Sequence, residues 1–83
     1  MPKVFLDAGH GGKDPGALRN ELKEKDLNLT MAKKVGEILT NEYENVTVLY
    51  SRTTDKTVSL KERTDMANKA NSNYFFSIHV NAG

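Results

Sequence analysis

The chain has 83 residues, of which 37% are hydrophobic and 28% charged, so it has room for one small domain with a core. Its net charge of +1 does not favour nucleic acid or an anionic membrane surface as a partner. The absence of cysteine excludes a disulfide framework, a thiolate metal site and a cysteine nucleophile. No stretch approaches the ~20 apolar residues of a membrane-spanning helix, so we expect no membrane insertion, and no signal peptide is visible.

The first half of the chain predicts a strand, a loop and a helix. Lys3 to Asp7 is a short apolar run followed by glycine, which is typical of a buried strand. Residues 8–22 are rich in glycine, proline and asparagine and predict a loop. From about Glu24 to Tyr43, apolar residues recur at spacings of three and four, which predicts an amphipathic helix. The side chains expected on its buried face are Leu27, Met31, Val35, Ile38 and Leu39.

The second half predicts a strand, a helix and a strand. Val46 to Ser51 is β-branched and apolar, and residues 53–57 form a turn region. Ser59 to Glu62 is a capping-box signature, which opens a helix that runs to about Asn71. Tyr74 to Val80 predicts the third strand, with its aromatic side chains in the core. This βαβαβ order predicts an α/β fold in three layers, with parallel strands, right-handed crossovers and helices on the faces of the sheet.

Two histidines lie near the carboxyl ends of predicted strands. His10 follows the first strand inside a glycine-rich segment, and His79 lies near the end of the third strand. Because these strand ends line one edge of a parallel sheet, where ligands usually bind, the two imidazoles can meet. A single histidine is more often a hydrogen-bonding residue than a ligand, and no short metal motif links the pair. Both interpretations therefore stay open at this point.

Glu24 favours the metal interpretation. It begins the helical stripe that continues through Leu27, so its carboxylate is expected to point inward at the start of the helix. The helix dipole also favours an acidic residue in the first turn, but it does not explain the alignment with a buried stripe. A carboxylate beside two imidazoles is the donor set of a catalytic zinc site that keeps a fourth position for water. The lysines expected on the solvated face are Lys23, Lys25, Lys33 and Lys34.

Two aspartates flank the first histidine. Asp7, at the end of a strand, either orients His10 through its second ring nitrogen or shapes the loop. Asp14 is most simply a turn residue. It also argues against a nucleotide-binding loop, because it stands where a dinucleotide motif needs glycine. In addition, it follows Lys13, where a P-loop needs serine or threonine.

Three further polar residues are candidates for contacts around such a site. Arg52 ends the second strand, and Arg63 lies on the second helix. Both are expected either to pair with internal carboxylates, which is the simpler interpretation, or to hold a substrate carboxylate. Asn81 is expected either to contact substrate or to close a turn.

Six short blocks occur in order along nearly the whole chain: Asp7–Ala17, Glu24–Leu29, Ser51–Thr53, Val58–Arg63, Ala67–Asn68 and Ser77–Ala82. Each block alone is weak, but six in register are specific. Together they resemble the zinc-dependent N-acetylmuramoyl-L-alanine amidases of type 3, which are cell-wall hydrolases of bacteria, their spores and their phages. The resemblance implies hydrolysis of the amide between N-acetylmuramic acid and L-alanine in peptidoglycan.

The resemblance also implies roles for particular residues. His10, Glu24 and His79 match the zinc ligands of the family, with Zn²⁺ polarising the amide carbonyl and activating the attacking water. The family domain is about twice as long, so residues 1–83 are expected to be the amino-terminal part of a catalytic domain and the first half of a larger mixed sheet. The general base of the family is a glutamate that would lie beyond Gly83. The expected place of action is the cell wall or the extracellular space, reached through a spore, mother-cell or phage route.

Two consequences follow from that expected truncation. The third strand is left with an exposed edge, which favours self-association. Without the general base, the chain is expected to be a weak catalyst, because such a base typically contributes ~10²- to 10⁴-fold to the rate. The alternative function is a non-catalytic module on the same scaffold that binds peptidoglycan or regulates its hydrolysis.

Overall fold

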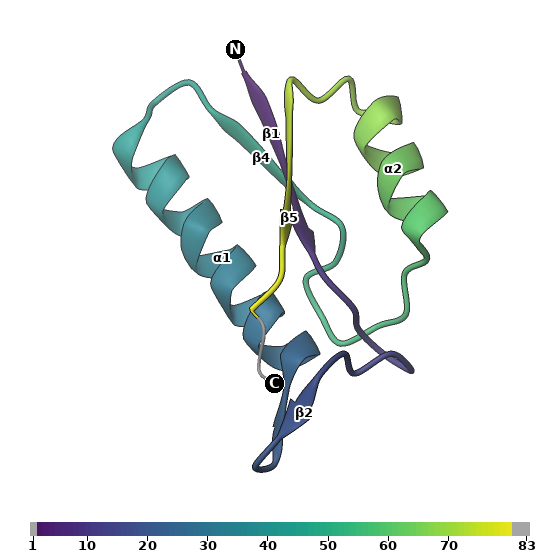
Figure 1. Ribbon diagram of the computed structural model, residues 1–83. Helices are drawn as coiled ribbons and strands as arrows, with labels where there is room; N and C mark the ends of the chain where they lie inside the picture. Colours follow the sequence, from purple (N-terminus) through teal and green to yellow (C-terminus); the bar gives the residue numbers. More distant parts are fainter. Residues whose placement is uncertain (1, 81–83) are drawn as a thin grey trace.

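The computed structural model describes residues 2–80 and has the predicted α/β order (Figure 1). Each predicted helix and strand is present, with bounds that differ by at most a few residues. The elements in chain order are β1 (Lys3–Ala8), β2 (Leu18–Arg19), β3 (Leu22–Lys23), α1 (Glu24–Glu42), β4 (Thr47–Tyr50), α2 (Leu60–Lys69) and β5 (Tyr74–Ile78).

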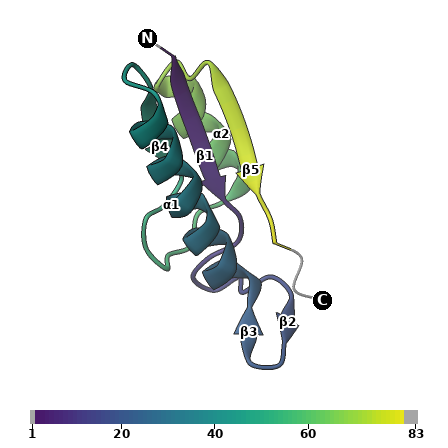
Figure 2. The same cartoon turned by 90° about the vertical axis from the view of Figure 1, so that its left-hand side faces the viewer.

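A parallel sheet in the order β4-β1-β5 forms the middle layer. Helix α1 covers one face of the sheet and α2 the other, as the two ribbon views agree (Figures 1 and 2). The predicted three-layer arrangement is thereby confirmed. Strand β1 lies in the centre and supplies most of the core: Val4, Phe5, Leu6 and Ala8 are all less than 10% exposed. Its carboxyl end leads directly into the glycine-rich loop, so the rigid centre of the sheet positions that loop.

The face of α1 that packs on the sheet differs from the predicted one. Met31 and Ile38, expected in the core, are 45% and 51% exposed. Small residues explain the difference, since a Cβ atom at Gly36 would collide with the hydroxyl of Tyr50. The helix therefore approaches the sheet along a line of residues spaced by four and not along its largest apolar side chains. The buried residues of α1 are Glu24, Lys25, Asn28, Ala32 and Gly36.

The predicted capping box at the start of α2 is confirmed. The Ser59 hydroxyl accepts a hydrogen bond from the Glu62 amide at 3.0 Å, and the Glu62 carboxylate accepts one from the Ser59 amide at 2.9 Å. These two bonds satisfy amides that a helix start otherwise leaves without partners. The helix ends at Lys69, and Asn71 takes a left-handed φ of 56° just beyond it. Asparagine tolerates that conformation better than most residues, which explains the helix end.

Residues 8–22, predicted as a loop, contain a short hairpin that the sequence did not reveal. Strands β2 and β3 pair antiparallel and project from the end of the sheet (Figure 2). The two residues between them, Asn20 and Glu21, have φ angles of 48° and 69°. Two left-handed residues in succession make the turn that suits a tight hairpin. The usual sequence signal for this turn is Asn-Gly. Here glutamate stands in the second position, so the sequence did not predict the turn.

Strand β5 lies at one edge of the sheet, and its aromatic side chains are not in the core. Tyr74, Phe75 and Phe76 are 56%, 45% and 53% exposed, so the prediction that they are buried is wrong. The reason is that β5 pairs only with β1 within residues 2–80, and the helices leave its outer side uncovered. Self-association through this edge stays a prediction. Over the described residues, neither helix combines the length and the apolar character needed to cross a membrane.

Candidate metal centre

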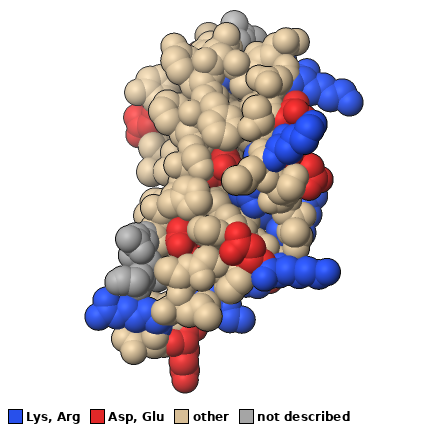
Figure 3. All heavy atoms as spheres, turned by 45° about the vertical axis from the view of Figure 1, so that its right-hand side comes forward, with Lys and Arg blue, Asp and Glu red and all other residues tan. Residues whose placement is uncertain are grey.

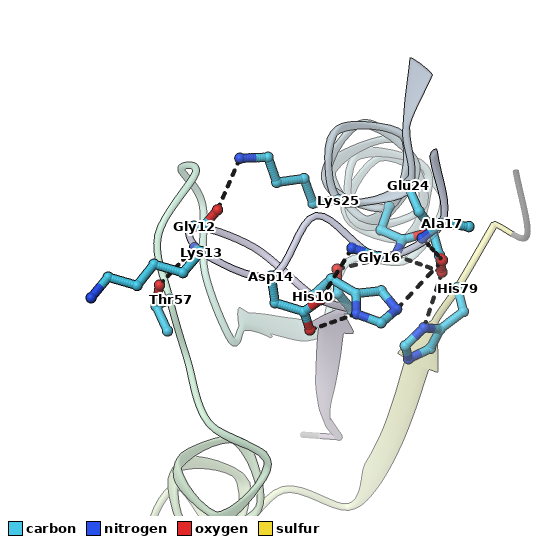
Figure 4. Close-up of polar contacts among 12 residues, drawn as sticks. His10, Gly12, Lys13, Asp14, Gly16, Ala17, Glu24, Lys25, Thr57 and His79 are labelled. Carbon is cyan, nitrogen blue, oxygen red and sulfur yellow. Dashed lines mark hydrogen bonds and ion pairs between the residues drawn. The ribbon is translucent and has the colours of Figure 1, made fainter. Parts of the chain in front are cut away.

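His10 leaves the end of β1 in a strained conformation and is held by an aspartate. Its φ of 62° is left-handed, which is uncommon outside glycine and often marks a functional position. Nδ1 of its ring lies 2.7 Å from Oδ2 of Asp14, and Nε2 lies 3.4 Å from Oε1 of Glu24 (Figure 4). The other Asp14 oxygen accepts from the Gly16 amide at 3.1 Å. Asp14 therefore orients the ring, and of the two roles left open for Asp7, orienting His10 is not the one observed.

Glu24 begins α1 and is 6% exposed. Its Oε1 accepts a hydrogen bond from the Ala17 amide at 3.1 Å, and its Oε2 accepts one from the Asn28 side chain at 3.2 Å. Burial raises the pKa of Glu24, whereas the bonds from Ala17 and Asn28 lower it. These two hydrogen bonds and a further one with His79 outweigh the effect of burial, so the pKa of Glu24 lies below its ordinary value. The carboxylate is ionised near neutral pH and available as an anionic ligand.

His79 follows β5 and completes the group (Figure 4). Its Nδ1 lies 3.2 Å from Oε2 of Glu24, and its ring meets that of His10 edge-on with centroids 5.0 Å apart. One ligand atom from each of His10, Glu24 and His79 lies within 4.8 Å of the other two. The structure thus brings together the three residues that the sequence singled out, from two strand ends and one helix start.

Two glycines leave the space that these side chains occupy. A Cβ atom at Gly9 would lie 2.6 Å from Nδ1 and 2.7 Å from Nε2 of His79. A Cβ atom at Gly16, whose φ is 69°, would lie 2.7 Å from Cδ2 of His10 and 2.9 Å from Oε1 of Glu24. Any larger residue at either position would displace a ring or the carboxylate.

Arg52 and Arg63 fix the backbone that carries His10. Arg63 is 4% exposed, bonds Oδ1 of Asp7 at 2.7 Å and donates to the carbonyls of Ala8 and His10 at 2.6 and 2.7 Å. Arg52 donates from Nε to the same two carbonyls, at 3.1 and 2.9 Å, and is 3% exposed. Both guanidinium groups are therefore engaged inside the protein. Internal pairing with a carboxylate is observed for Arg63, whereas the partners of Arg52 are carbonyls.

Lys25 was expected on the solvated face and is instead 8% exposed. Its ammonium group donates to Oδ2 of Asp55 at 2.8 Å and to the Gly12 carbonyl at 3.0 Å. The Gly12 amide donates to the other oxygen of Asp55 at 2.7 Å. The hydrogen bond from Lys25 holds the pKa of Asp55 below its ordinary value. This cluster ties the segment after β4 to the histidine loop, and helical periodicity gave no signal for it.

An open cleft of about 380 Å³ lies beside the two rings. Its walls include His10, His79, Asp14 and the segment 57–60 before and at the start of α2. On the face that Figure 3 shows, lysine, arginine and acidic side chains are interspersed, and neither sign forms a continuous patch. Asn81, a candidate for substrate contact, lies outside the described residues.

The three side chains have the chemistry and spacing of a divalent-metal site. Two imidazoles and one carboxylate form a donor set that catalytic zinc sites use. Oε1 of Glu24 lies 3.4 Å from His10 and Oε2 lies 3.2 Å from His79, and one ligand atom from each of the three residues lies within 4.8 Å of the other two. Ligands bonded at 2.0–2.1 Å to a tetrahedral ion lie about 3.4 Å apart, so the three side chains are close enough to converge on one ion. The residues present therefore fit such an ion.

Comparison with known proteins places the chain in a family. The sequence profile of the N-acetylmuramoyl-L-alanine amidases matches residues 4–83. The chain belongs to this amidase family. The resemblance that the six blocks indicated is thereby confirmed.

Individual known proteins are similar to this chain along almost its entire length. The chain is 55% identical over 83 residues to the sporulation-specific N-acetylmuramoyl-L-alanine amidase of Bacillus subtilis (strain 168), covering 100% of this chain and 32% of that protein. It is 51% identical over 79 residues to the endolysin of Bacillus phage SPP1, covering 95% and 29%. The solved catalytic domain of CwlV, an amidase from Bacillus (Paenibacillus) polymyxa var. colistinus, superposes with a TM-score of 0.92 at 41% identity, covering 98% and 46%. The chain thus spans about a third of these two curated relatives and under half of the solved domain.

Proposed function

We propose that this chain is the zinc-binding part of a peptidoglycan amidase, which hydrolyses the amide between N-acetylmuramic acid and L-alanine. The observation that carries the proposal is the convergence of His10, Glu24 and His79 at the carboxyl edge of the sheet, in a chain of the amidase family. The place of action is the cell wall or the extracellular space, which agrees with relatives named as a sporulation amidase and a phage endolysin.

Zn²⁺ bound there would polarise the amide carbonyl and lower the pKa of a bound water. The residues of the chain prepare that site. Asp14 fixes the His10 ring so that Nε2 faces Glu24, and the carboxylate of Glu24 is kept ionised by its hydrogen bonds. The adjoining cleft leaves room for a substrate beside both rings.

A second candidate is a non-catalytic module that binds peptidoglycan or regulates its hydrolysis. Two aspartates line the cleft where a general base would be needed. Both are already engaged in other contacts, which favours a module without catalytic activity. Asp7 is bonded by Arg63 and by the Ser77 hydroxyl. The hydrogen bond to His10 holds the pKa of Asp14 below its ordinary value, which makes it a weak proton acceptor. The amidase proposal therefore assigns the general base to a glutamate beyond Gly83, as the family resemblance implies.

Purified sacculi separate the two candidates. Sacculi would be incubated with zinc-loaded chain, and both bound protein and newly released N-terminal alanine would be measured. The amidase proposal predicts slow release that disappears with a chelator and with Glu24→Gln, while Glu37→Gln, an exposed change on the same helix, has no effect. Binding without release supports the module. A folded chain that neither binds nor cleaves sacculi contradicts both.

A further inference from the structure

Asn28 lies one helical turn after Glu24 and is 0% exposed. Its Nδ2 donates to the Gly9 carbonyl at 3.0 Å and to Oε2 of Glu24 at 3.2 Å. Its Oδ1 accepts a hydrogen bond from the backbone amide of Val80. One side chain thus contacts a member of the three-residue cluster, the residue before His10 and the residue after His79.

The three partners suit asparagine and no other residue of its size. The two N–H groups of the side-chain amide meet two acceptors, and its oxygen meets a donor, so every strong hydrogen-bonding group is used. Aspartate would place a second carboxylate against Glu24 and would lose both donors. Alanine would leave the Gly9 carbonyl and the Val80 amide without this partner in a dry environment, at a cost in stability. The side chain is therefore matched to its surroundings atom by atom.

We propose that Asn28 is the positioning residue of the metal centre, because it sets the relative placement of the three ligand-bearing segments before an ion binds. This inference rests on the proposed zinc site. The segments come from β1, α1 and β5, and Asn28 bridges all three through one rigid amide. Groups that orient metal ligands typically change metal affinity 10- to 100-fold when they are replaced.

The test compares Asn28→Asp and Asn28→Ala with Asn41→Asp, an exposed change on the same helix. Zinc affinity would be measured at neutral pH by competition with a chromogenic chelator, and the stability of each metal-free variant by urea unfolding. The Asp variant keeps an acceptor for the Val80 amide but loses the donors to Glu24 and Gly9. Hydrogen exchange of the Val80 amide in the metal-free wild type provides a readout that needs neither a variant nor an ion.

We expect Asn28→Asp and Asn28→Ala to weaken zinc binding by 10- to 100-fold in the folded protein, and Asn41→Asp to leave it unchanged. The Val80 amide should exchange slowly in the wild type and in the Asp variant, and faster in the Ala variant. A purely structural role would lower the urea midpoint while the affinity of the folded protein stayed at the wild-type value, and that result overturns the inference. A rapidly exchanging Val80 amide in the wild type also overturns it. Wild-type protein that binds no zinc overturns the proposed function instead, and this inference with it.

Discussion

Nδ1 of His10 lies 2.7 Å from Oδ2 of Asp14, and Nε2 of the same ring faces Glu24. A carboxylate on one ring nitrogen fixes the tautomer and the direction of the other nitrogen. Asp14 thereby fixes the orientation of the His10 ring on its glycine-rich loop, so that Nε2 is presented to the metal site. The same contact, together with a bond from the Gly16 amide, keeps the loop in its bend.

Replacing Asp14 with asparagine is expected to weaken zinc binding by about 10- to 100-fold, because the ring loses its charged partner. Isothermal titration of zinc into the purified variant measures the change. Asp65→Asn, which removes only the exposed partner of Lys61 on α2, provides the control. Equal affinities of wild type and the Asp14 variant would limit Asp14 to a role in the turn.

Gly9→Ala is expected to reduce zinc affinity with little loss of stability. The added methyl group would collide with the His79 ring, whereas Gly9 is not among the residues with positive φ, so alanine fits its backbone. Zinc titration and urea unfolding of the same variant separate the two effects. Unchanged affinity would mean that the ring moves aside without leaving the site.

Arg63→Met is expected to destabilise the fold by about 3–5 kcal/mol, since it leaves the Asp7 carboxylate buried without its cation. The carbonyls of Ala8 and His10 lose a donor as well. Urea unfolding provides the measurement, with the exposed Arg19→Met on β2 expected to stay within about 0.5 kcal/mol of wild type. A loss below about 1 kcal/mol for Arg63→Met would show that water enters and solvates Asp7.

Self-association is expected through the outer edge of β5. Phe76 is 53% exposed and borders an apolar hollow with Leu6, Val35 and Leu39, so a second copy can add a strand and cover aromatic surface. Sedimentation velocity over a concentration series should show association that Phe76→Lys suppresses. Leu22→Lys, equally exposed at 53% but on β3, should not suppress it. Wild-type protein that remains monomeric throughout would contradict the prediction.

The meeting of His10 and His79 was predictable because it follows from a general rule. Parallel strands present their carboxyl ends at one edge, and both histidines follow such ends. The capping box at Ser59 was equally readable, since its two hydrogen bonds involve residues three apart. Both features depend on local sequence or on strand order alone.

The features that the sequence concealed depend on tertiary packing. Periodicity ranked Met31 above Ala32 for burial, but close approach of α1 to the sheet favours small residues. Lys25 is buried because Asp55, 30 positions later, folds back against it. Asp14, predicted only as a turn residue, contacts His10 because the chain bends at residues 10–14, whereas Asp7 is bonded to Arg63.

Anomalous scattering at the zinc absorption edge, from crystals of the chain grown with zinc, shows whether one ion binds at His10, Glu24 and His79. We expect one strong peak bonded to Nε2 of His10, Nδ1 of His79 and a carboxylate oxygen of Glu24. A peak at other residues, or none in well-ordered crystals in which these three side chains adopt the described positions, would contradict it.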